Sequence, residues 1–73
     1  MIFKVIVDDV EFTKSFLNKY NSKMNTKFEL IEIHDWEVTF GSIESNGANN
    51  DEILKLSIQY GKSSIRNRLG IYN

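Results

Sequence analysis

The chain begins with a short apolar run that is typical of a β-strand. Residues 2–7, IFKVIV, are rich in β-branched side chains and are apolar at both alternating sets of positions, apart from Lys4. A strand with this pattern is covered on much of both faces. The run therefore predicts a strand in the centre of a sheet.

Residues 8–24 change to the spacing of an amphipathic helix. Their larger apolar side chains fall on one side of such a helix: Phe12, Phe16, Leu17 and Tyr20. The lysines fall toward the other side or the C-terminal end, where positive charge suits the helix dipole: Lys14, Lys19 and Lys23. Asp8 or Asp9 is expected to cap the N-terminus, and Asp8 with Glu11 has the spacing of a capping box.

Residues 27–33 and 36–43 have the composition and alternation of two strands. His34 and Asp35 link them, which predicts a tight hairpin, with one continuous bent strand as the alternative. Alternation in the second segment directs Glu37 outward. The same alternation directs three apolar side chains inward: Trp36, Val38 and Phe40.

The second half of the chain contains a polar loop and another alternating segment. Residues 44–51, ESNGANND, have the composition of a loop. In residues 52–61, alternating apolar positions predict a half-buried strand: Leu54, Leu56, Ile58 and Tyr60. The tail, residues 62–73, is expected to form a short strand or a short helix. Helical spacing joins Ile65, Leu69 and Tyr72, although Gly70 weakens a helix.

These elements predict the α+β class. Residues 1–73 are expected to form one small domain in the order β-α-β-β-β, with one helix packed on a mostly antiparallel sheet. The hydrophobic content is 41%, and five Phe, three Tyr and one Trp supply core material for a chain of 73 residues. Such a composition argues against a disordered chain.

The composition also excludes several classes of protein. Without Cys, the chain has no disulfides, no Cys-based zinc site and no thiol nucleophile. No signal peptide is expected, and no apolar run approaches the roughly 20 residues that span a bilayer. We therefore expect a cytoplasmic protein that makes no membrane contact. Many Ile, Lys and Asn and no Pro are typical of an AT-rich genome, which favours a phage or mobile-element origin.

The segment IEIHDWEVTF, residues 31–40, gathers residue types that bind metals or catalyse reactions: Glu32, His34, Asp35 and Glu37. Strand alternation places Glu32 and His34 on one face and Asp35 and Glu37 on the other, so one metal cannot easily bind all four. A zinc site also normally uses several His or Cys ligands, and the chain has only one His. The Asp35-x-Glu37 pair lacks the Lys of a metal-dependent nuclease, since position 39 is Thr. The segment GKSS lacks the earlier Gly of a phosphate-binding loop. We predict no catalytic residue, no metal, no cofactor and no enzyme activity.

The net charge of −1 conceals an uneven distribution. Residues 28–54 contain no Lys or Arg but contain all of these acids: Glu29, Glu32, Asp35, Glu37, Glu44, Asp51 and Glu52. Residues 55–73 contain no acid but contain Lys55, Lys62, Arg66 and Arg68. Such asymmetry influences which partners a protein attracts.

Three hypotheses follow from this distribution. In the first, the acidic segment is a surface that binds another protein with a basic surface and inhibits a larger protein that handles nucleic acid. In the second, Lys62, Arg66, Arg68 and Tyr72 bind RNA or DNA, because basic and aromatic side chains together bind single strands. In the third, the protein is a structural subunit that oligomerises through a strand edge, so both monomer and homodimer remain open.

Overall fold

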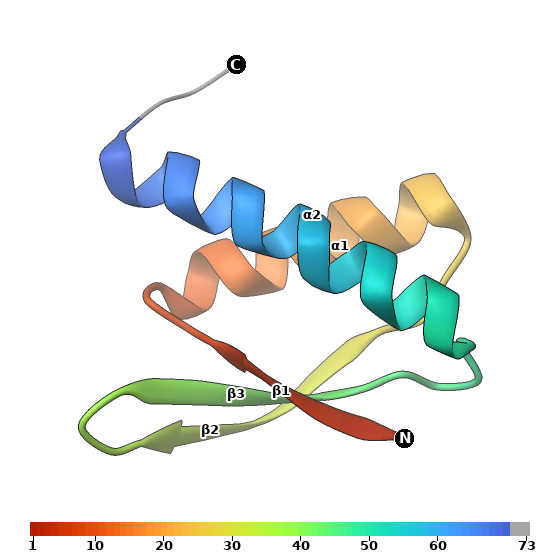
Figure 1. The fold of residues 1–73 in the computed structure, drawn as a ribbon, viewed down its shortest axis with the longest axis horizontal. Coiled ribbons are helices and arrows are strands. Elements are labelled where there is room, and N and C mark those ends of the chain that lie inside the picture. The colour runs from red at the N-terminus through yellow and green to blue at the C-terminus, as the bar shows by residue number, and fades with distance from the viewer. Residues whose placement is uncertain (71–73) are drawn as a thin grey trace.

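Two helices cover one face of a three-stranded antiparallel sheet (Figure 1). The computed structural model describes residues 1–70, so Tyr72 of the predicted tail lies outside the described residues. The elements follow in this order: β1 (Ile2–Ile6), α1 (Val10–Met24), β2 (Glu29–Asp35), β3 (Thr39–Glu44) and α2 (Asn50–Leu69). The predicted α+β class is confirmed, whereas the order β-α-β-β-β with a single helix is wrong in its last element.

The central strand of the sheet is β3, which pairs with β1 on one side and with β2 on the other. The prediction that residues 2–7 form a central strand is therefore wrong. β1 is an edge strand, and its apolar residues divide between two faces. Phe3 and Val5 pack under the helices, while Ile2 and Ile6 point the other way and are exposed.

Glycine at position 41 allows the sheet to pack closely on its helical side. A Cβ on Gly41 would lie 2.7 Å from Leu30 Cδ1 and 2.8 Å from Val7 Cγ2. Ile43 points to the same side and is 1% exposed. Because strand residues alternate, Phe40, Ser42 and Glu44 belong to the side without helices.

The predicted first helix is confirmed as α1, and its cap is one of the two predicted residues. Asp9 is the N-cap, since its Oδ1 accepts a hydrogen bond from the Phe12 N–H at 3.2 Å. The expected capping box of Asp8 and Glu11 is wrong, because the helix begins one residue later than that spacing requires. Asn25 ends α1 in the left-handed region at φ 55°, which Asn tolerates better than most residues.

The predicted hairpin exists, but its turn is displaced toward the C-terminus. β2 continues through His34 and Asp35, and residues 36–38 form the connection. Trp36 and Val38 are therefore exposed in the turn, and Phe40 lies half-buried on the side without helices. The prediction that these three side chains point into the core is wrong, because the alternation was counted from a turn placed two residues too early.

The segment predicted as a final strand is the first half of α2. Its alternating apolar residues also contain a helical pattern, since Ile53, Leu56 and Tyr60 are three and four residues apart and face the core. A capping box begins the helix: Asn49 Oδ1 accepts from the Glu52 N–H at 2.9 Å, and Glu52 Oε1 accepts from the Asn49 N–H at 3.1 Å. The helical alternative for the tail is correct up to Leu69.

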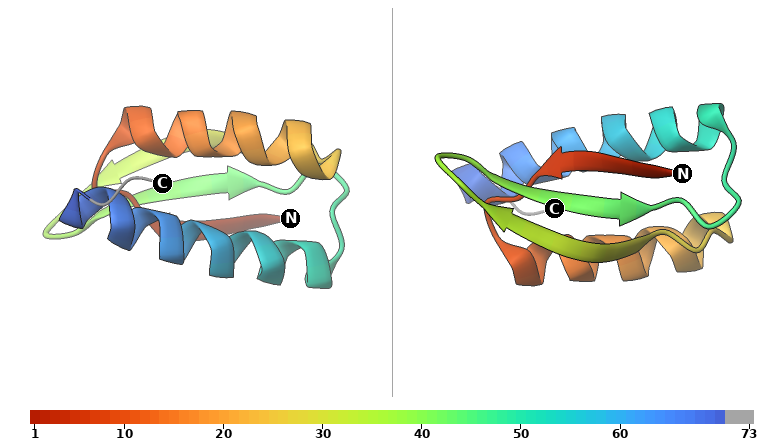
Figure 2. Two further views of the ribbon diagram at one scale, coloured as in Figure 1. Left: turned by 90° about the horizontal axis from the view of Figure 1, so that it is seen from above. Right: turned by 90° about the horizontal axis from the view of Figure 1, so that it is seen from below.

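The core lies between the sheet and the two helices. Its central residues come from three elements and one loop: Leu17, Tyr20, Phe28, Ile43 and Leu56. Helix α1 lies over the β2 side of the sheet and α2 over the β1 side (Figure 2). Among residues 1–70, no helix is both long and apolar enough to cross a membrane.

Candidate functional site

One face of the sheet has no helix over it (Figure 2, right), and the strand register gives it nine residues in three rows. Residues that are partners across antiparallel strands lie on the same face. From β1 through β3 to β2, the rows are Ile2–Glu44–Glu29, Lys4–Ser42–Glu32 and Ile6–Phe40–His34. We call these nine residues, together with Trp36, the open face.

Trp36 lies at one end of the open face, beside the third row. It is 71% exposed, and its ring lies 6.0 Å from that of His34, measured between centroids. The ammonium nitrogen of Lys4 lies 6.0 Å from the Trp36 ring centroid, at the outer limit of a cation–π contact. The indole thus extends over the sheet surface and leaves most of its area in solvent.

Apolar side chains of the third row continue this surface beside Trp36. Ile6 is 50% exposed and Phe40 is half-buried, whereas Ile2, which is 58% exposed, lies in the first row, beyond Lys4. A cluster of exposed apolar side chains rimmed by polar groups is typical of an interaction surface. The open face therefore has the composition of a protein-binding site.

Three polar side chains form a small network in the middle of the open face. His34 Nε2 lies 3.1 Å from Ser42 Oγ and 3.7 Å from Glu32 Oε2. Ser42 is buried despite its place on this face, because its neighbours cover it. The network holds the His34 ring against β3. Within residues 1–70, no group of three potential metal ligands comes together.

The predicted acidic residues are divided between the two layers. Glu29, Glu32 and Glu44 belong to the open face. Asp35 alternates with His34 and belongs to the other face of the sheet, and Glu37 lies in the connection between β2 and β3. The remaining two, Asp51 and Glu52, lie in the first turn of α2, where they complement the helix dipole. Tertiary structure thus places three of the seven acids on the open face.

Glu44 is engaged within the chain. Its Oε2 accepts hydrogen bonds from the terminal amine of Met1 at 2.9 Å and from the Ser45 N–H at 2.8 Å. These bonds, the amine first, hold the pKa of the Glu44 carboxyl below its usual value. Glu29, Glu32, Asp35 and Glu37 are exposed; Glu32 lies 3.7 Å from His34, and Asp35 accepts a hydrogen bond from the Thr39 hydroxyl at 3.0 Å.

The residues of the predicted basic tail do not all lie together. Arg68 is paired with Asp8, whose Oδ2 accepts from Arg68 Nη2 at 2.6 Å and from Nε at 3.0 Å. Lys62 and Arg66 are exposed on another side of α2, and Tyr72 lies outside the described residues. The four residues of the second hypothesis are therefore not shown to form one site.

Sequence reasoning missed the apolar part of the open face and a second group of cations. Ile2 and Ile6 were assigned to a strand covered on both faces, so their exposure was not foreseen. The sequence pattern predicts Lys55 on a strand, but Lys55 lies on α2. Lys62 and Arg66 follow it by seven and eleven residues, which places all three on one face of the helix. The spacing of Asn49 and Glu52 is that of a capping box, and it is the sequence signal that could have predicted the start of α2.

With this geometry described, the chain was compared with known proteins. It matches no protein-family model, no curated protein and no solved structure.

Proposed function

We propose that this protein is a non-enzymatic binding module that docks the open face onto a basic surface of another protein. The observation that carries the proposal is the 71% exposure of Trp36, the only Trp of the chain, beside other exposed apolar side chains. Trp is among the residues most enriched at the energetic centres of protein interfaces. A soluble chain has no internal reason to leave such a surface uncovered.

The charge of the surface selects the kind of partner. Glu29 and Glu32 lie on β2 within the open face and are exposed, whereas Lys4 is the one Lys or Arg in the three rows. These carboxylates speed encounter with a basic surface and repel an acidic one. A second copy of the chain would place these carboxylates near their own equivalents. We therefore favour a basic partner over a homodimer at this face.

The same carboxylates suggest what binding would do. A basic surface on a larger protein that handles nucleic acid attracts phosphates. Carboxylates arranged along β2 would occupy the positions that those phosphates take. The proposed consequence is inhibition of that protein, which is also the role expected for a small phage or mobile-element product.

Affinity capture with matched variants tests the proposal. Wild-type protein and the variants Trp36→Ala, Glu32→Lys and Glu11→Lys are immobilised and exposed to extract from the native host. Glu11 is exposed on α1, in the other layer, and gives the same charge change as the Glu32 variant. We expect one protein to be retained by wild type and by Glu11→Lys and to be lost from the other two variants.

The captured protein is then purified and its dissociation constant is measured against salt. Weakening with rising salt, together with a change in Trp36 fluorescence on binding, supports docking at the open face. Equal binding by all variants, or affinity that ignores salt, overturns it. Loss of binding in Ile58→Ser instead would move the interface to the exposed outer side of α2. A salt-independent dimer of the chain alone, lost in Trp36→Ala, would favour oligomerisation.

A further inference from the structure

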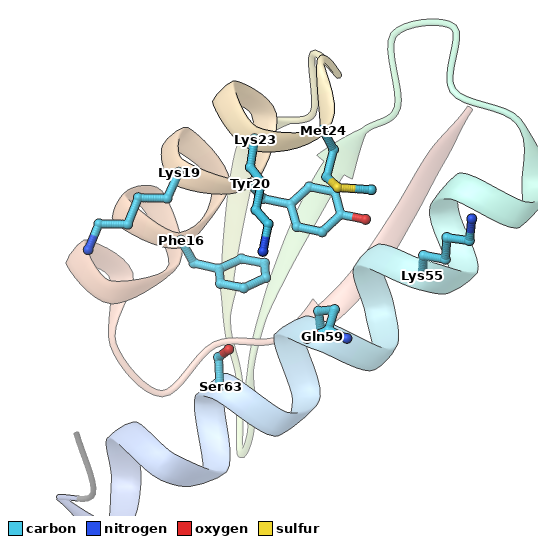
Figure 3. A pocket seen from close by; sticks show the side chains of 8 residues that line it. All are labelled: Phe16, Lys19, Tyr20, Lys23, Met24, Lys55, Gln59 and Ser63. Carbon is cyan, nitrogen blue, oxygen red and sulfur yellow. The ribbon is translucent and has the colours of Figure 1, made fainter. Parts of the chain in front are cut away.

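A groove runs between α1 and α2, on the side of the molecule away from the open face (Figure 3). Its volume is about 400 Å³, within the range of roughly 300–1,000 Å³ that small-ligand sites occupy. Phe16 and Tyr20 project from α1 into the space between the helices, and Gln59 and Ser63 border it from α2. The groove thus combines an aromatic wall with polar groups on the opposite side.

The charged side chains that line the groove are all lysines. Lys19 and Lys23 border it from α1, and Lys55 borders it from α2. The ion pairs among residues 1–70 join Met1 to Glu44, His34 to Glu32 and Arg68 to Asp8, so they involve none of these lysines. The charge of the groove is therefore not neutralised within the described part of the chain.

The basic surface continues along α2 beyond the groove. Lys62 and Arg66 follow Lys55 by seven and eleven residues, so helical geometry places all three on one side of the helix. At 1.5 Å rise per residue, the row from Lys55 to Arg66 is about 16 Å long. The positive charge therefore extends along α2 beyond the groove.

The low isoelectric point of the whole chain conceals the basic charge of the groove. The sequence pI of about 5.7 averages the basic groove with the acidic open face, which lie on opposite sides of the sheet. Glu52 lies close enough to the groove that its charge adds to burial in raising the pKa of Tyr20. The Glu52 Oε1 atom accepts a hydrogen bond from the Asn49 N–H at the N-terminal end of α2.

We propose that this groove binds a short single-stranded nucleic acid. The lysines contact successive phosphates, and an unstacked base enters the groove between the exposed edge of Phe16 and Gln59, because the Phe16 ring is itself stacked with Phe12 and Tyr20. Lysine contacts to phosphates carry no sequence information, so the binding is expected to be non-specific. A duplex offers its phosphates but no free base to a concave pocket of this size, which favours a single strand.

Fluorescence anisotropy with labelled oligonucleotides tests the proposal. The probes are a single-stranded oligothymidylate, its RNA equivalent and a duplex, each measured over a series of salt concentrations. For single strands the slope of log affinity against log salt is about −0.7 per phosphate contact, so three lysines predict a slope near −2. We expect both single strands to bind and the duplex to bind more weakly.

Charge-removing variants locate the site. Lys23→Gln and Lys55→Gln are each expected to weaken binding several-fold and to make the salt slope shallower by about 0.7. The matched control is Lys14→Gln, which removes the same charge from the outer side of α1, where Lys14 borders Leu17 and Phe28. Phe16→Leu keeps an apolar side chain of similar bulk and is expected to weaken binding without changing the slope.

Any of these results overturns the proposal: no anisotropy change with either single strand, equal losses in Lys14→Gln and Lys55→Gln, or a duplex that binds as tightly. Competition by inorganic phosphate at the same concentration as oligonucleotide phosphate also overturns it, because it indicates a simple anion site. Urea unfolding of each variant separates lost binding from lost folding. The groove and the open face share no residue, so either proposal can fail without the other.

Discussion

The hydroxyl groups of Thr13 and Tyr60 lie 2.9 Å apart in the buried space between α1 and α2. The Tyr60 hydroxyl donates to the carbonyl oxygen of Ile6 at 2.8 Å. The Thr13 hydroxyl also lies 3.1 Å from the carbonyl oxygen of Asp9, so its one proton is shared between Asp9 and Tyr60. Thr13 is 0% exposed and Tyr60 is 5% exposed. One phenol thus joins both helices to the end of β1.

Replacing Tyr60 with Phe removes both hydrogen bonds and keeps the ring. The Ile6 carbonyl and the Thr13 hydroxyl are left without this partner in a buried site, so the free energy of unfolding is expected to fall by about 1–3 kcal/mol. Urea unfolding followed by circular dichroism measures the change. The control is Tyr20→Phe, whose hydroxyl borders the open groove; an equal loss in both variants would contradict this account.

Stability is expected to fall in alkali because of the same tyrosines. Burial, the larger cause, and the charges of Asp8 and Asp9 raise the pKa of Tyr60, and burial followed by Glu52 raises that of Tyr20. The folded chain then holds its phenol protons more tightly than the unfolded chain, whose tyrosines titrate near pH 10. The stabilisation is complete below about pH 10 and is lost progressively above it.

The measurement is the urea midpoint across this range for wild type and for the double variant Tyr20→Phe, Tyr60→Phe. The double variant lacks both phenols, so its midpoint should fall less steeply above about pH 10. Lysine titration affects both proteins alike and cancels in the comparison. Parallel profiles would show that the two tyrosines do not cause the alkaline loss.

Two glycines should respond in opposite directions to the same substitution. Gly61 lies in the middle of α2, and a Cβ there would meet nothing within 4 Å. Gly61→Ala is expected to raise the free energy of unfolding by about 0.5–1 kcal/mol, because Ala loses less backbone freedom on folding.

Gly41→Ala is the matched comparison. Its Cβ would come within 3.0 Å of side chains of both Leu30 and Val7, so we expect a loss of about 1–3 kcal/mol from overpacking. Both variants are compared with wild type by urea unfolding under one set of conditions. Stabilisation by Gly41→Ala, or destabilisation by Gly61→Ala, would contradict the packing of that residue.

Acid should weaken the contact between the chain terminus and β3. The Met1 amine and the Ser45 N–H lower the pKa of Glu44, so its contribution to stability is present above the usual carboxyl pKa and is lost as pH falls through the lowered value. Glu44→Gln should be less stable than wild type near neutral pH, and the difference should vanish in acid. A difference that persists at low pH would exclude the carboxylate as its cause. Glu37→Gln, in the exposed turn, is the control and should match wild type throughout.

Local patterns in the sequence were sufficient for α1 and for the hairpin. Helical spacing of Phe12, Phe16 and Tyr20 has no competing strand pattern, and the acids before it provide the cap. The segment 52–61 was ambiguous because apolar residues at 53, 54, 56, 58 and 60 satisfy both periods. Packing resolves it: α2 covers the β1 side of the sheet, which α1 alone leaves open.

The sequence by itself determined the α+β class, the absence of cysteine chemistry and the separation of acids from bases along the chain. These depend on composition and on short-range spacing. Only the tertiary structure decided that β1 is an edge strand, that the displaced turn leaves Trp36 exposed and that Lys19, Lys23 and Lys55 line one groove. Each of these depends on which distant segments become neighbours, and side chains from several elements share a face only after the sheet and both helices have packed.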